Sequence, residues 1–314
     1  MKMAKIRFLE QGEEAKIPMG AKLLPKRGRL AYAEKRRPFR VEEEGDILTG
    51  ILQTQAEKSM LPIWRENAAG LLRQLQKGGV SIVIPPTAGE IPRTILPLAE
   101  GRKLMTLFAF EGAAEALRRQ GKEPDTCTYL FAGGDPALWR MALISLGNEV
   151  NHLAIFTEDI HGARAVAEEL FEERGLVAEV FSSPKNILFP QADVVFCCGF
   201  ANLPYEHMLK GGCIWFDLVG NRPVLRRLRE RQDITLADGF FFRQERSGFR
   251  SAEQKEGRIA EAEAFLSSEN MRDLWQLSPE TEAGAQAFRE QKEREWAVSG
   301  FSLAGKRVKI RRKP

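Results

Sequence analysis

The chain contains 314 residues, of which 43% are hydrophobic and 29% are charged, and this length is sufficient for two domains with buried cores. No apolar run approaches the roughly 20 residues that cross a membrane, and Met1–Leu9 lacks the apolar core of a signal peptide. We therefore expect a cytoplasmic protein without a membrane partner, and its net charge of +4 is mild but unevenly placed.

The first part of the chain, Lys5–Arg40, is expected to form short strands and turns, because glycine and proline interrupt it repeatedly. Within it, Lys22–Arg40 carries eight basic residues and one acid, Glu34, and the tail Lys306–Pro314 is basic too. We interpret both stretches as solvated surface. Contact with nucleic acid or an acidic partner is the alternative, but neither stretch has the aromatic signature of an RNA-binding module, so nucleic acid is not expected.

The next part combines helices and strands. A helix is predicted over Gln55–Gln76, with a break or kink at Pro62. The β-branched run Val80–Ile84 predicts a strand, and Leu104–Phe108 predicts a second one. An alanine-rich helix over Gly112–Gln120 follows.

From there, short apolar runs alternate with amphipathic segments, a pattern typical of a parallel sheet that helices cover on both faces. The predicted strands are Cys127–Phe131, His152–Phe156, Ala178–Phe181, Asp193–Cys197, Ile214–Leu218 and Asp233–Leu236. The predicted helices are Pro136–Leu146, Gly162–Arg174, Tyr205–Leu209 and Val224–Arg231, and beyond Arg250 also Ser251–Leu266 and Glu280–Trp296.

A glycine turn joins the first of these strands to its helix. Gly133 and Gly134 follow Ala132, and amides at the start of the helix would face an anion such as a pyrophosphate. Asp135 and Pro136 give a second explanation, because an aspartate cap followed by proline starts a helix well and satisfies the amides that a phosphate needs. The turn is therefore either a dinucleotide site or a self-capped βαβ turn.

The second strand ends in Thr157-Glu158-Asp159, and an acid at that place can accept hydrogen bonds from a ribose. Because Glu158 would repel a 2′-phosphate, we expect NAD rather than NADP as the cofactor. The residues expected to line this cofactor site are Ala132, Gly133, Gly134, Asp135, Thr157, Glu158, Asp159, Cys198 and Gly199.

The cysteines and histidines offer no competing chemistry. The four cysteines stand in apolar runs without a CxxC pair, so we expect reduced, buried thiols, including Cys197 and Cys198. The three histidines have no metal-ligand spacing, and no metal site is expected.

Several segments together resemble the shikimate/quinate dehydrogenase superfamily over about Gly112–Gly239. They are the turn Ala132–Gly134, the strand Ala192–Phe196, the pair Asp238–Gly239 and, most specific, Asp217–Asn221, which is close to the family's Asp-Leu-Val-Tyr-Asn. The resemblance implies a Rossmann domain that binds NAD(P) and an oxidoreductase acting on a small substrate.

The catalytic half of that family is not reproduced. Its lysine falls on Thr87, its aspartate on Ala109 or Phe110, and its motif tyrosine on Gly220, so no catalytic residue is identified. The resemblance places substrate contacts at three residues, which are Thr87, Asn221 and, about two positions out of register, Gln244.

We therefore expect an α/β protein with a Rossmann-like, mostly parallel domain over residues 108–250. A smaller N-terminal α/β domain covers 1–107, and a helical segment with a basic tail covers 251–314. The favoured function is a shikimate-dehydrogenase-like, NAD-linked oxidoreductase without the usual lysine–aspartate dyad, acting on an unidentified small substrate as a homodimer. The alternative is a non-catalytic nucleotide-binding or assembly module that kept the fold.

Overall fold

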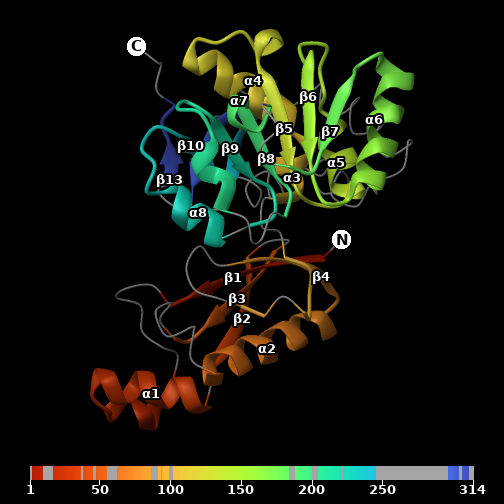
Figure 1. Cartoon of the computed structure of the whole chain (residues 1–314). Coiled ribbons are helices and arrows are strands. Elements are labelled where there is room, and N and C mark those ends of the chain that lie inside the picture. Colours follow the sequence, from red (N-terminus) through yellow and green to blue (C-terminus); the bar gives the residue numbers. More distant parts are fainter. Residues whose placement is uncertain are drawn as a thin grey trace. The chain divides into compact units, whose positions relative to one another are not determined.

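The structure is a computed structural model in which the chain divides into two compact units, Met1–Glu100 and Gly101–Pro314 (Figure 1). We call them the first and the second unit and describe each by itself. The residues that the structure describes are 2–9, 17–36, 38–44, 47–54, 62–85, 91–92, 94–98, 102–183, 188–199, 204–220, 222–244, 296–303 and 306–310.

The first unit is built on a four-stranded sheet of order β2-β3-β1-β4, in which only the β2–β3 pair is antiparallel. Its strands are β1 (Lys2–Phe8), β2 (Phe39–Glu44), β3 (Ile47–Leu52) and β4 (Val80–Ile84). Helix α2 (Pro62–Lys77) packs the buried side chains Leu71, Leu72 and Leu75 on this sheet. Gly50 leaves the room that Leu71 needs, because a Cβ there would lie only 3.0 Å from the Leu71 side chain.

Two expectations for the first unit change. The predicted helix Gln55–Gln76 is observed from Pro62 onward, because proline suits the first helical turn; residues 55–61 lie outside the described part. The basic stretch expected as strands is a 3₁₀ turn, η1 (Met19–Leu23), followed by α1 (Lys26–Arg36). Lysine and arginine favour helix, and here this preference outweighs the glycine within the stretch.

The second unit contains a six-stranded sheet of order β10-β9-β8-β5-β6-β7, and all its neighbouring strands are parallel. Its strands are β5 (Thr128–Ala132), β6 (His152–Phe156), β7 (Ala178–Phe181), β8 (Val194–Cys197), β9 (Ile214–Asp217) and β10 (Thr235–Ala237). In chain order this is the doubly wound arrangement 6-5-4-1-2-3 of a Rossmann fold. The predicted α/β fold class is thereby confirmed.

Helices cover both faces of this sheet (Figure 1). One core cluster joins it to four helices: α3 (Arg102–Leu107), α4 (Ala109–Gln120), α5 (Pro136–Leu143) and α6 (Ile160–Arg174). The other joins it to α7 (Leu188–Gln191), the turn η4 (Pro204–Met208) and α8 (Arg222–Leu228). In β5, β6 and β8 the buried residues alternate between the two clusters, which explains why these strands are mainly apolar.

The expected strand Leu104–Phe108 is wrong, because Leu104–Leu107 belong to helix α3. Leu104, Met105, Leu107 and Phe108 are all buried. A short run that is apolar at every position has no period that separates a strand from a buried helix.

A three-stranded antiparallel sheet, β11-β12-β13, completes the second unit. Strand β11 (Gly239–Gln244) pairs with β12 (Trp296–Leu303), which pairs with β13 (Lys306–Val308). The helices expected over Ser251–Leu266 and Glu280–Trp296 lie outside the described residues, except that Trp296 begins β12. The described C-terminal residues are thus mainly strand, since buried Val298 and Phe301 pack as strand residues.

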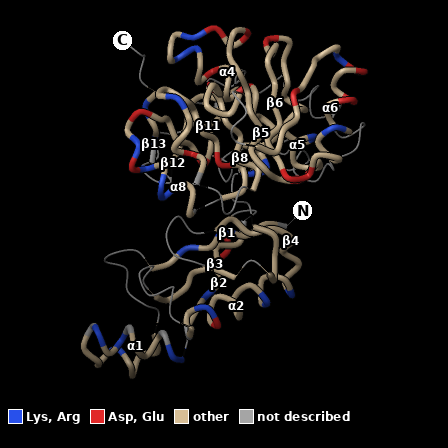
Figure 2. The backbone as a smooth tube through the Cα atoms, in the orientation of Figure 1, with Lys and Arg blue, Asp and Glu red and all other residues tan. Residues whose placement is uncertain are grey.

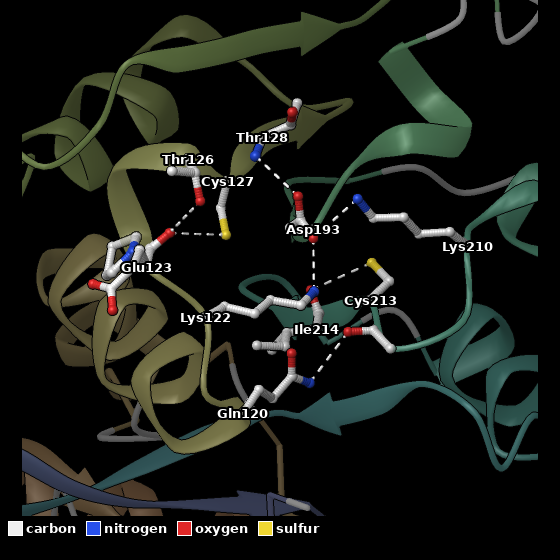
Figure 3. Close-up of polar contacts among 12 residues, drawn as sticks. Gln120, Lys122, Glu123, Thr126, Cys127, Thr128, Asp193, Lys210, Cys213 and Ile214 are labelled. Atoms are coloured by element: carbon white, nitrogen blue, oxygen red, sulfur yellow. Dashed lines mark hydrogen bonds and ion pairs between the residues drawn. The ribbon is translucent and has the colours of Figure 1, made fainter. Parts of the chain in front are cut away.

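A polar cluster ties together the amino ends of β5, β8 and β9 (Figure 3). The Asp193 carboxylate accepts hydrogen bonds from the Lys122 ammonium group at 2.7 Å and from the Thr128 amide at 3.2 Å, and it pairs with the Lys210 ammonium group at 2.9 Å. Burial raises the pKa of Asp193, but these contacts outweigh burial and hold the pKa below its ordinary value. The adjacent Cys213 is buried, and desolvation raises the pKa of its thiol to about 12.

Within the described part of the chain, no helix is long and apolar enough to cross a membrane.

Candidate functional site

The candidate site lies at the carboxyl ends of β5 and β8, where the strand order of the parallel sheet reverses. After β5 the chain continues to β6 and β7 on one side, and it then returns to β8 on the other side. In open α/β sheets, ligands bind in the crevice that this reversal creates. The loops after β5, β6, β8 and β9 therefore define the candidate site.

The glycine turn after β5 is held firmly in place. Gly133 and Gly134 have φ angles of 73° and 95°, which glycine adopts without strain. The Gly133 amide donates to the Phe156 carbonyl at the end of β6 (2.7 Å), and the Gly133 carbonyl accepts from the Trp139 indole N–H (2.8 Å). The turn is thus fixed both to the neighbouring strand and to its own helix, α5.

Gly134 is required for close packing against the loop after β8. A Cβ on Gly134 would overlap the carbonyl oxygen and the side chain of Cys198. The Cys198 amide in turn donates to the Ala132 carbonyl at 2.9 Å. The glycine that brings a pyrophosphate close to the backbone in dinucleotide sites here brings Cys198 close instead.

Asp135 caps helix α5, as the self-capped alternative requires. Its carboxylate accepts a hydrogen bond from the Leu138 amide at 3.0 Å, and Pro136 occupies the first helical position. Among hydrogen bonds between described residues, none engages the amide of Gly134 or of Asp135. Within the described part of the chain, two backbone amides of the turn thus stay available to an anion, whereas the Leu138 amide is used by the cap.

The two acids of the loop after β6 differ in role: Glu158 is exposed, and Asp159 caps a helix. Asp159 caps α6 by accepting from the Gly162 amide (3.0 Å), while its own amide donates to the Thr157 hydroxyl (3.1 Å). Glu158 is exposed beside it. Glu158 therefore remains the candidate for a ribose contact, whereas Thr157 and Asp159 shape the loop.

The first turns of α5 and α6 lie in contact, because a Cβ on Gly162 would overlap both Pro136 and the Asp159 carboxylate. This contact places the glycine turn and the acidic loop at the same edge of the sheet. Arg164, the nearest basic residue on α6, lines a groove with Phe171 and Val177 between α6 and the chain around β7.

The thiols at this edge are not poised as nucleophiles. Cys198 is 2% exposed and Cys197 is fully buried. Desolvation raises the pKa of Cys198 well above its ordinary value, and the negative charges of Asp135 and Asp217 act in the same direction. Gly199, which follows Cys198, has a φ of 128° and approaches Gly134.

The loop after β9 contacts a residue that sequence reasoning missed, Arg102 at the start of helix α3. Asp217 is fully buried and accepts hydrogen bonds from the amides of Val219 (3.3 Å) and Gly220 (2.8 Å). Arg102, at the start of α3, donates to the Val219 carbonyl at 2.8 Å. Gly220 has a φ of 78°, and a Cβ there would overlap the Arg102 guanidinium.

The Arg102 guanidinium lies beside Gly220, whose φ of 78° suits glycine. A side chain at position 220 would occupy the space of the Arg102 guanidinium. No local signal in the sequence identifies this contact, because 117 positions separate Arg102 from Val219. The expectation of a strand at Leu104–Phe108 also concealed that Arg102 begins a helix.

The expected substrate contacts fall outside the part of the chain that the structure describes. Thr87 and Asn221 lie outside the described residues. Gln244 ends β11 opposite Trp296, and its side chain is likewise outside the described part. In the part of the chain that the structure describes, no three His, Cys, Asp or Glu side chains are grouped to hold a metal ion.

Comparisons with known proteins give only distant similarity. No protein-family profile and no curated protein matches the chain. Among solved structures, Δ(1)-pyrroline-2-carboxylate reductase of Thermococcus litoralis, in complex with NADH and L-proline, is 17% identical with a TM-score of 0.28. The match covers 40% of each chain, so it spans less than half the length of that reductase.

Two further matches cover more of the chain. L-tryptophan dehydrogenase of Nostoc punctiforme is 17% identical over 68% of this chain and 61% of its own, with a TM-score of 0.28. A putative aspartate carbamoyltransferase of Trypanosoma cruzi is 9% identical over 69% and 71%, with a TM-score of 0.29. Similarities this low assign neither a family nor an activity, and the Rossmann-like fold is established by the chain's own strand order.

Proposed function

We propose that the second unit binds NAD at the carboxyl ends of β5, β6 and β8 and that the protein is an NAD-linked oxidoreductase acting on a small substrate. The observation that carries this proposal is the convergence of three features at the strand-order reversal. They are the glycine turn, its two backbone donors at Gly134 and Asp135, and the exposed carboxylate of Glu158.

The residues present fit the adenosine half of the cofactor well. Glu158 would accept hydrogen bonds from the ribose hydroxyls, and the amides of Gly134 and Asp135 would donate to the pyrophosphate. Cys198 and Gly199 would lie toward the nicotinamide, which supplies hydride transfer when bound. The buried, protonated thiol of Cys198 would offer an apolar wall there and no base.

One residue opposes the pyrophosphate. The Asp135 carboxylate is a negative charge at the point where the anion would lie, and two such charges ~5 Å apart repel by about 1–3 kcal/mol at a partly screened site. Asparagine caps a helix as well as aspartate does but carries no charge. We therefore expect Asp135→Asn to tighten NAD binding about tenfold without loss of stability.

Isothermal titration calorimetry of the whole chain with NAD and NADP tests the proposal. The expected result is binding of NAD in preference to NADP by about tenfold, because Glu158 repels the 2′-phosphate. Glu158→Arg should abolish or reverse this preference. Asp125→Asn, an exposed change at the opposite end of the sheet, is the matched control for Asp135→Asn.

The second candidate function is a non-catalytic binding or assembly module. It is favoured by the contact of Cys198 with Gly134 and by the self-capping of Asp135, since both use the turn for packing. Failure of the wild type and of Asp135→Asn to bind either dinucleotide at millimolar concentration would support this module and exclude the oxidoreductase.

The finer assignments also remain proposals. A shikimate-dehydrogenase-like character is supported most specifically by Asp217–Asn221, and contacts of a substrate with Thr87, Asn221 and Gln244 follow from this resemblance. A homodimer in the cytoplasm, and domains at 1–107, 108–250 and 251–314, belong to the same proposal. Sedimentation equilibrium of the whole chain measures the oligomeric state.

A further inference from the structure

We propose that the segment Met19–Arg36 docks the first unit onto an anionic membrane surface. The apolar side chains of η1 would enter the lipid interface, while the basic side chains of η1 and α1 face the headgroups. The inference concerns the first unit alone and is independent of dinucleotide binding by the second.

Exposed apolar side chains concentrate in this segment. Among the described residues, five large hydrophobic side chains are exposed, and three of them are Met19 (84%), Leu23 (91%) and Leu24 (40%). The other two, Phe171 and Val177, line the groove at α6 in the second unit. A single exposed leucine is ordinary, but three exposed large apolar side chains within six residues are a local concentration that points to a partner.

Exposed basic side chains lie in the same segment as these apolar side chains. Lys22 lies within η1 and is exposed, as are Arg27, Lys35 and Arg36 on α1. Figure 2 shows lysine and arginine toward both ends of α1. A cluster of four to eight basic residues attracts the negative surface of anionic lipids, and a combined apolar and basic signal anchors a protein more stably than either signal alone.

A membrane suits both features better than the other acidic partners. A stable protein interface takes roughly 20–30 residues from each side, more than the exposed side chains of Met19–Arg36 supply. Nucleic acid would use the basic residues but not Met19 or Leu23, since aliphatic side chains provide no stacking face for a base. A lipid interface accommodates both the apolar and the basic side chains and requires no membrane-spanning helix. The proposal therefore replaces the expectation of no membrane partner with binding at the membrane surface.

Co-sedimentation of the whole chain with lipid vesicles tests this inference. We expect binding to vesicles that contain about one third phosphatidylglycerol in phosphatidylcholine, and none to pure phosphatidylcholine, because surface charge drives the encounter. Raising the salt from about 0.05 to about 0.5 M should weaken the binding, since screening shortens the reach of the headgroup charge.

Two variants separate the apolar from the electrostatic contribution. Met19→Ser/Leu23→Ser and Lys35→Gln/Arg36→Gln should each lower vesicle affinity by about tenfold or more. All four side chains are exposed, so the fold should be unchanged, which far-UV circular dichroism verifies.

Matched controls in the second unit are Phe171→Ser/Val177→Ser and Arg226→Gln/Arg229→Gln, which alter exposed side chains of the same kinds and should leave vesicle binding unchanged. Sedimentation equilibrium confirms that all variants keep the oligomeric state of the wild type. Absence of wild-type binding to vesicles that contain phosphatidylglycerol overturns the inference. The inference is also overturned if Met19→Ser/Leu23→Ser binds vesicles as tightly as the wild type. It is overturned as well if duplex DNA competes with the vesicles and binds this variant as tightly as it binds the wild type.

Discussion

At the scale of single residues, Gly134 combines a backbone constraint with a packing constraint. Its φ of 95° is strained for any other residue, and a Cβ would overlap Cys198. We expect Gly134→Ala to lower the free energy of unfolding by about 2–4 kcal/mol, measured by urea denaturation. Gly175→Ala is the control, since Gly175 has a φ of 66° but open space around it, and should lose only about 1 kcal/mol. Equal losses of unfolding free energy in the two variants would show that Cys198 moves away to accommodate the added methyl group.

The four cysteines provide a second prediction at this scale. Cys127, Cys197, Cys198 and Cys213 are all buried, and desolvation raises the pKa of Cys127, Cys198 and Cys213. We expect a disulfide reagent such as dithionitrobenzoate to leave all four unmodified in the native protein at pH 8 and to titrate all four in guanidinium. Rapid modification of a native thiol would contradict the burial of that side chain.

At the scale of elements, Asp193 joins three strands at their amino ends. Its pKa in the folded protein is depressed, so its ionised form stabilises the fold above the unfolded-state pKa of about 3.9 and this contribution is lost as the pH falls through the lower folded-state value. Asp193→Asn should lower the free energy of unfolding by about 1.5–3 kcal/mol at pH 7. Denaturation from pH 7 to pH 3 should show the difference between wild type and variant shrinking only below about pH 4.

Helices and strands whose ends are defined by neighbouring residues, such as a cap or a proline, could be predicted from the sequence. Strands β6 and β7 lie where expected, and α5 starts at Pro136 as its cap predicts. Contacts that join distant parts of the chain could not be predicted. The pairing of Asp193 with Lys122 and the packing of Arg102 on Gly220 depend on where the sheet brings separate elements, which no local pattern encodes.

In the candidate site, too, local features could be predicted from the sequence and contacts between distant segments could not. Gly133, Gly134 and Glu158 lie at the expected edge of the sheet because they directly follow strands. The packing of Cys198 on Gly134 arises between two loops that only the strand order makes neighbours.

At the scale of the whole molecule, each apolar cluster belongs to a single unit. The cluster of the first unit ends at Leu98, and both clusters of the second unit lie beyond Arg102. We therefore expect residues 101–314 expressed alone to fold and to unfold in one cooperative urea transition. A fragment that binds the dye ANS strongly and lacks a near-ultraviolet dichroism signal would contradict this expectation.

The pairing of β11 with β12 bears on how the protein is made. The two strands are hydrogen-bonded neighbours, yet residues 245–295 separate them in the chain. Phe240 of β11 and Phe301 of β12 pack together against Phe216 of β9. Until the ribosome has added the intervening residues, Phe216 and Phe240 cannot pack against Phe301. During this time the nascent second unit exposes aromatic surface, which chaperones bind and which favours aggregation.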